Sequence, residues 1–162
     1  MFTLKQHHIG DPWFFVENNI AHMWFLTQPT SLPSNERGKH WDVGYAVSSD
    51  LKTWEYRGLA LERGWGDAWD GQKLATGCVI KRNDLYWMAY TGHRRRWFGV
   101  QRAGLAWSED LVHWRKLDEN PVSEAVLPWY DLGPREVDPV HCHWRDPFFV
   151  EDGPWMYHLI CA

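Results

Sequence analysis

The stretch GDPWFFVENNIAHMWFLTQ, residues 10–28, decides the fold because it has two counterparts further along the chain. They are ATGCVIKRNDLYWMAYTGH at 75–93 and RDPFFVEDGPWMYHLICA at 145–162. Each copy consists of an apolar run, a polar turn and a second apolar run. The turns contain Asn, Asp or Gly, which accept the backbone of a tight hairpin at little cost. Each copy therefore predicts a β-hairpin.

A second pair of similar segments lies between these hairpins. VGYAVSSDLKTWEYRG at 43–58 matches AGLAWSEDLVHWRKLD at 103–118. In each, a strand is expected to end at Ser48 or Trp107, an Asp-Leu pair to form a turn, and Trp54 or Trp114 to open the next strand. One repeat unit thus contains four antiparallel strands, which is the pattern of a β-propeller blade.

The repeats predict an all-β fold, because no long segment shows the 3.6-residue apolar period of a helix. We expect one partial propeller domain over 1–162, with about two and a half blades. Blade 1 is predicted at about 8–63, blade 2 at about 74–118, and the first half of blade 3 at about 144–162.

Composition excludes several classes of protein. The chain has 162 residues, with 17 Lys and Arg against 21 Asp and Glu, and a formal net charge of -4. A nucleic-acid binder would carry a basic face, and the short basic run at 94–96 is interpreted as a solvated loop. No stretch approaches the ~18 apolar residues of a membrane helix, and no secretory signal precedes residue 10. We therefore expect a cytoplasmic protein with no nucleic-acid or membrane partner, unless the N-terminus is processed.

Cysteine and histidine spacing predicts no metal site and no other cofactor. Cys78, Cys142 and Cys161 are widely spaced and are expected to be free thiols. Four histidines near the two Asp-Pro turns are interpreted as hydrogen-bonding groups rather than ligands: His7, His8, His141 and His143.

The 13 tryptophans fall into two groups. The first group lies in or next to the repeated strands and is expected to pack between blades: Trp24, Trp54, Trp87, Trp114 and Trp155. The second group lies outside the strands and is the better source of rings that stack on a sugar: Trp65, Trp69, Trp97 and Trp129.

The turns Asp11-Pro12 and Asp146-Pro147 occupy the same place in two repeats. In a propeller the first strand of each blade lines the central channel, so Asp11 and Asp146 are expected to face one cavity. Paired carboxylates in a cleft are typical catalytic groups of glycoside hydrolases. The alternative is that Asp-Pro serves only as a turn before a strand.

Taken together, these segments resemble the five-bladed β-propeller glycosidases of family 32, and more distantly those of family 43. Gly10-Asp11-Pro12-Trp13 is similar to the motif that carries the family's nucleophile, and Arg145-Asp146-Pro147 to its Arg-Asp-Pro. The segments at 25–29 and 44–54, FLTQP and GYAVSSDLKTW, match two further motifs. Asp70, Thr76-Gly77 and residues 90–92 are similar to the family's Asp…Ser-Gly and Tyr-Thr-Gly stretches.

The resemblance implies a glycoside hydrolase that acts on a furanoside or a related glycoside. Asp11 would be the nucleophile of a retaining enzyme or the general base of an inverting one. Asp146 would hydrogen-bond sugar hydroxyls with Arg145 beside it. The remaining implied contacts to the sugar come from Gln28, Trp41, Trp69, Asp70 and Thr76.

The family's catalytic acid, a Glu in a later blade, has no counterpart in this chain, and Glu124 and Glu136 lie on the wrong side of the Arg-Asp-Pro motif. The chain is thus expected to be the N-terminal half of a longer product, or to close its propeller by association with a second chain. A non-catalytic carbohydrate-binding propeller and a plain interaction scaffold are the alternative functions.

Overall fold

The computed structural model describes residues 2–94, 100–130 and 143–162. These residues form ten strands and no helix. The strands are β1 (His7–Glu17), β2 (Ile20–Pro29), β3 (Asp42–Ser48), β4 (Glu55–Leu61), β5 (Lys73–Arg82), β6 (Leu85–His93), β7 (Gln101–Ser108), β8 (Arg115–Lys116), β9 (Arg145–Asp152) and β10 (Trp155–Cys161). Accordingly, this part of the chain contains no helix that could span a membrane.

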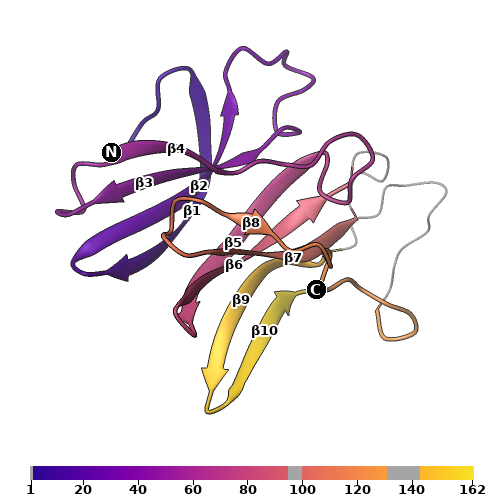
Figure 1. Ribbon diagram of the computed structural model, residues 1–162. Helices are drawn as coiled ribbons and strands as arrows, with labels where there is room; N and C mark the ends of the chain where they lie inside the picture. The colour runs from indigo at the N-terminus through magenta and orange to yellow at the C-terminus, as the bar shows by residue number, and fades with distance from the viewer. Residues whose placement is uncertain (1, 95–99, 131–142) are drawn as a thin grey trace.

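The strands form three antiparallel sheets in chain order: β1-β2-β3-β4, β5-β6-β7-β8 and the hairpin β9-β10. The first strands of the sheets are neighbours, since β1 packs beside β5 and β5 beside β9. Figure 1 shows the three sheets fanning out from this line of first strands. Two four-stranded blades and half of a third thus form part of a β-propeller, as the repeats predict.

The hairpin turns have the backbone that their residues favour. Asn18 and Asn19 have φ angles of 50° and 62°, and Asn83 and Asp84 have φ angles of 52° and 62°. Two consecutive residues with positive φ form the turn whose twist matches that of the flanking strands.

The Ser-x-Asp-Leu segments fold as two copies of one turn. Ser48 Oγ donates to Asp50 Oδ1 at 3.0 Å, and this oxygen also accepts the backbone N–H groups of Lys52 and Thr53. Ser108 and Asp110 repeat the same pattern after β7. Both turns end at the predicted tryptophan, so β4 begins at Glu55 and β8 at Arg115, one residue after the predicted starts.

Two apolar clusters hold the sheets together. Trp24 is fully buried between blades 1 and 2, with its ring against Tyr45 and edge-on to Trp114. Trp87 packs on the cluster of Cys78, Ala89 and Phe149 between the second and third sheets. These three tryptophans lie between blades, as expected.

Two tryptophans of this group do not lie between described blades. Trp54 packs against the buried cluster of Met23, Phe25 and Ala46 on the other face of blade 1. Trp155 is 67% exposed, because the strand alternation of β10 turns it to the open side of the hairpin. Because these outer faces of the first and third sheets have no described neighbour, the expectation that both rings pack between blades stays a prediction.

Candidate active site

Each first strand contains one extra residue at the same level. The β1–β2 register shifts between Gly10 and Trp13, the β5–β6 register between Ala75 and Gly77, and the β9–β10 register around Asp146 and Pro147. A β-bulge of this kind bends the strand and redirects the side chain that it carries. The three repeats thus place Asp11, Thr76 and Asp146 in equivalent positions.

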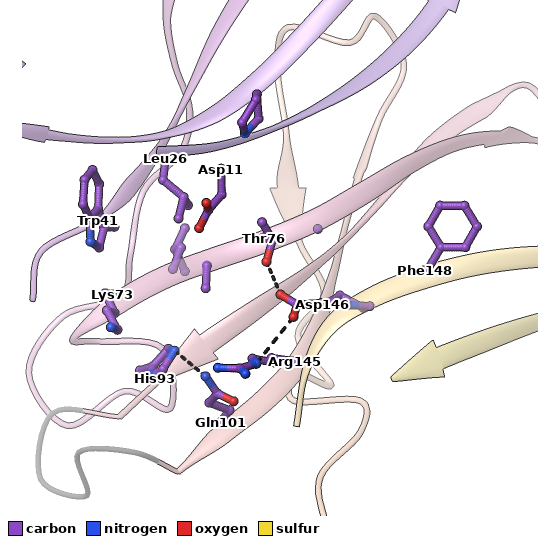
Figure 2. A pocket seen from close by; sticks show the side chains of 15 residues that line it. Asp11, Leu26, Trp41, Lys73, Thr76, His93, Gln101, Arg145, Asp146 and Phe148 are labelled. Atoms are coloured by element: carbon purple, nitrogen blue, oxygen red, sulfur yellow. Dashed lines mark hydrogen bonds and ion pairs between the residues drawn. The ribbon is translucent and has the colours of Figure 1, made fainter. Parts of the chain in front are cut away.

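These three residues line one pocket of about 760 Å³, which we call the axial pocket. Its other lining residues are Pro12, Leu26, Trp41, Lys73, Leu74, Ala75, Gly77, His93, Gln101, Arg145, Pro147 and Phe148. Asp11 and Asp146 come from strands of different blades, and the two carboxyl groups are exposed to this pocket (Figure 2). The repeat therefore brings together two carboxylates that lie far apart in the sequence.

A ring of hydrogen bonds fixes Asp146. Its backbone N–H donates to Thr91 Oγ1 at 3.1 Å, and the Thr91 hydroxyl donates to the Thr76 carbonyl at 3.2 Å. The Thr76 hydroxyl closes the ring by donating to Asp146 Oδ1. Arg145 Nε lies 3.5 Å from Asp146 Oδ2. Three strands of two blades therefore determine where this carboxylate lies.

Three polar residues of the axial pocket are not among the sequence-predicted contacts. Lys73, His93 and Gln101 lie on the same side of the pocket as Arg145 (Figure 2), and Gln101 Nε2 is 3.3 Å from His93 Nε2. Burial lowers the pKa of Lys73. Lys73 begins β5 and Gln101 begins β7, and His93 ends β6, which lies antiparallel between them. All three residues therefore lie at one end of blade 2. The alternating strand directions of a four-stranded blade are the sequence signal that could have placed these three residues together.

The sequence-predicted contacts divide into two groups. Thr76, Arg145 and Trp41 line the axial pocket, and Trp41 supplies an apolar wall together with Leu26. Gln28, Trp69 and Asp70 do not line it. Gln28 is 3% exposed and accepts the Gly38 N–H at 3.0 Å.

Asp70 and Trp69 instead secure the loop between β4 and β5. Asp70 is 2% exposed, lies 2.5 Å from Lys116 Nζ and accepts the Tyr90 hydroxyl at 3.4 Å. The Trp69 ring lies 5.5 Å from that of Tyr90, over Gly92 and Gly104, where a Cβ atom would collide with it. Their surroundings are therefore those of structural anchors.

The remaining candidate residues lie elsewhere. Glu124 pairs with Arg102 and does not line the axial pocket. Trp65 and Trp129 are 89% and 80% exposed, also outside it. Several expectations fall outside the described residues: those for Arg95, Arg96, Trp97, Glu136, His141 and Cys142. Within the described part, no group of three or more His, Cys, Asp or Glu side chains is placed to hold a metal ion.

A model of the N-terminal domain of glycosyl hydrolases family 32 matches residues 2–161. The chain belongs to this family. Its own motifs fit the match, because the bulges that present Asp11 and Asp146 lie in the segments that resemble the family 32 motifs. No curated protein matches the chain significantly.

Solved structures show the same fold as this family 32 chain. Fructan 1-exohydrolase IIa from Cichorium intybus is 24% identical with a TM-score of 0.66, over 90% of this chain and 25% of its own. The β-fructofuranosidase BmSUC1 from Bombyx mori is 22% identical (TM-score 0.68; 94% and 29% covered). The β-fructofuranosidase from Schwanniomyces occidentalis is 18% identical (TM-score 0.72; 98% and 30% covered). The chain thus spans less than a third of the length of these proteins.

Proposed function

We propose that the axial pocket is the sugar-binding part of a glycoside hydrolase that cleaves a furanoside or a related glycoside. The observation that carries the proposal is the presentation of Asp11 and Asp146 into one pocket by equivalent bulges of different blades. Membership of family 32 and the likeness to three fructan- or fructoside-cleaving enzymes support it.

We infer different roles for the two carboxylates, following the resemblance to the family 32 motifs. Asp11 has no arginine before it in the chain, and it would attack the anomeric carbon or take a proton from water. Asp146, held by Thr76 and Arg145, would accept hydrogen bonds from hydroxyl groups of the sugar as positive charge develops on the sugar ring. The leaving oxygen needs a proton, and general acid catalysis of this kind contributes about 10²–10⁴ in rate.

The first prediction tests Asp11 in the complete protein. Asp11→Asn should abolish hydrolysis and leave the melting temperature nearly unchanged, because Asn tolerates the positive φ of 26° and the side chain is exposed. Release of reducing sugar from a β-fructoside and thermal unfolding measure the two effects. Asp84→Asn, at an exposed hairpin turn with a φ of 62°, is the matched control. Full activity of Asp11→Asn would contradict the proposal, and a large loss of stability would identify Asp11 as a structural cap.

A carbohydrate-binding protein without hydrolytic activity is the second candidate. Among the described residues that line the axial pocket, Asp11 and Asp146 are the only carboxylates, so this part of the chain supplies no proton donor of the glycosidase type. Sugar binding by the complete protein without any hydrolysis would favour this function.

We further propose that the chain associates through β9 and β10, with a second copy or with further blades. β10 has an unpaired edge in the described sheet, and the hairpin exposes five apolar side chains. They are Phe148, Val150, Trp155, Tyr157 and Leu159. Exposed edges and apolar faces of this kind favour association.

A further inference from the structure

A second pocket lies where β3 begins and β4 ends. It has a volume of about 270 Å³ and is lined mainly by residues 62–66, together with His40, Asp42, Leu59 and Gly71. We call it the rim pocket. Trp41, between His40 and Asp42, lines the axial pocket, so one short segment separates the two pockets.

The rim pocket presents an aromatic ring to solvent. Trp65 lines it and is 89% exposed, so most of the ring is open to a ligand. The loop that carries Trp65 is anchored at its other end by the buried Asp70 and its 2.5 Å contact with Lys116. Hydrogen bonds from Ala68 N–H to the Trp65 carbonyl and from Gly71 N–H to the Ala68 carbonyl hold the turn between them. A loop held in this way loses little backbone freedom when a ligand stacks on the Trp65 ring.

Fixed polar groups stand beside this ring. The Asp42 carboxylate accepts the Arg63 backbone N–H at 2.8 Å and the Arg63 guanidinium at 2.6 Å. His40 Nε2 lies 2.8 Å from Glu36 Oε2, and the Glu62 carboxylate is exposed on the pocket wall. The pocket therefore combines an apolar surface with oriented donors and acceptors, the usual composition of a small-molecule site.

The charges of the rim pocket select among ligands that stack on tryptophan. Arg63 is neutralised by Asp42, which leaves the Glu62 carboxylate as the surplus charge. A phosphate or an acidic sugar would be repelled, whereas the hydroxyls of a neutral sugar can hydrogen-bond to carboxylate, guanidinium and imidazole groups alike.

We propose that the rim pocket is a second carbohydrate-binding site, which holds a neutral sugar unit of a polymeric substrate outside the axial pocket. This inference rests on the proposed function for its ligand class. Its volume, about a third of that of the axial pocket, fits a short stretch of chain rather than an extended one.

The test is retention of the 162-residue chain in native gels that contain inulin or arabinan, with affinities from calorimetry. Trp65→Ala should weaken binding by about tenfold, as expected for loss of an aromatic anchor. Trp129→Ala removes a ring of similar exposure outside both pockets and should bind like the unmodified chain. Polygalacturonate, an acidic polymer, should cause no retention.

Three results would overturn the inference: equal binding by Trp65→Ala and the unmodified chain, equal losses in both tryptophan variants, or no retention by either neutral polymer. Asp11→Asn separates this inference from the proposed function. It should still be retained by the neutral polymer through Trp65, and its loss of hydrolysis in the complete protein reports on the axial pocket alone.

Discussion

Asp11 and Asp146 have φ angles of 26° and 53°, in a region that residues other than glycine seldom occupy. An ordinary Asp-Pro turn before a strand does not need this backbone. Strained conformations persist where the surroundings hold them, and they gather at functional sites. For Asp146 the hydrogen bonds of Thr76 and Thr91 provide that hold. Positive φ angles also occur in plain turns of this chain, for example at Asn18 and Asp84, so it is the placement of both side chains in the axial pocket that favours the functional interpretation.

Gly77 lies directly after the bulge that carries Thr76. A Cβ atom at this position would lie 2.0 Å from the Ala89 carbonyl oxygen. Because that neighbour is backbone, we expect Gly77→Ala to lower the free energy of unfolding by about 1–3 kcal/mol, the usual cost of overpacking. Urea denaturation measures the change.

Gly10, in the same part of blade 1, is the matched control for Gly77. A Cβ atom there would meet Leu26 and Trp41 at 3.7 and 3.8 Å, which are ordinary contacts. Gly10→Ala should change the free energy of unfolding by less than about 0.5 kcal/mol. Equal losses in the two variants would show that the close approach at Gly77 is not the cause.

The lowered pKa of Asp50 in the folded protein leads us to expect that stability depends on pH. Hydrogen bonds from the backbone of Thr53 and Lys52 and from the Ser48 hydroxyl lower its pKa from 3.8 to about 2. A carboxylate whose pKa is lower in the folded state stabilises the fold above its unfolded pKa, and this contribution is lost as the pH falls through the folded pKa. The difference in free energy of unfolding between the unmodified chain and Asp50→Asn should therefore be largest above pH 4 and decrease toward pH 2.

Urea midpoints measured between pH 2 and pH 6 check this expectation. Glu109→Gln, a change at an exposed position of the equivalent turn, is the control. A difference between Asp50→Asn and the unmodified chain that stays constant over this range would contradict it.

At the scale of elements, the contact between Asp70 and Lys116 joins the loop before β5 to the outermost strand of blade 2. Lys116→Met would leave Asp70 buried without its charged partner. Removal of one member of a buried pair costs about 3–5 kcal/mol, and this is the loss of unfolding free energy that we expect. Chemical denaturation measures it.

The pair of Lys81 and Glu17, 2.7 Å apart at an exposed position, provides the control for Lys116. Lys81→Met should change stability little, because exposed ion pairs contribute little to folding. A small effect of Lys116→Met, similar to that of Lys81→Met, would show that Asp70 does not depend on its partner.

The sequence was sufficient to predict those parts of the fold that depend on local structure and on the repeats. Apolar runs and the Asn-Asn, Asn-Asp and Asp-Gly turns predicted the hairpins, and the alignment of the repeats predicted that Asp11 and Asp146 share a pocket. It was insufficient where orientation depends on how a loop packs on the strands of a blade. Trp69 and Asp70 stand in a loop without periodicity, and their direction is set by contacts with Tyr90 and Lys116.

At the scale of the whole molecule, β9 and β10 form the most incomplete sheet of the described chain (Figure 1). We expect the chain alone to self-associate as its concentration rises, through the exposed face and edge of this hairpin. Leu159→Glu should reduce this association, because a buried unpaired carboxylate is costly. Sedimentation velocity over a range of concentrations measures the change.

Leu127 is exposed to a similar extent, 65% against 53% for Leu159, and lies outside the hairpin. Leu127→Glu should therefore associate like the unmodified chain. A monomer at all concentrations, or equal effects of the two substitutions, would contradict a role of β9 and β10 in association.

The repeated bulge also has a consequence for symmetry. Three equivalent backbone positions around an axis would offer a ligand several equivalent orientations. Here the equivalence is broken by side chains, since Arg145 precedes one aspartate, Gly10 precedes the other, and Thr76 donates its hydroxyl to only one of them. If the axial pocket holds a sugar, as proposed, the different side chains at the three equivalent positions would favour one orientation of the sugar over the others.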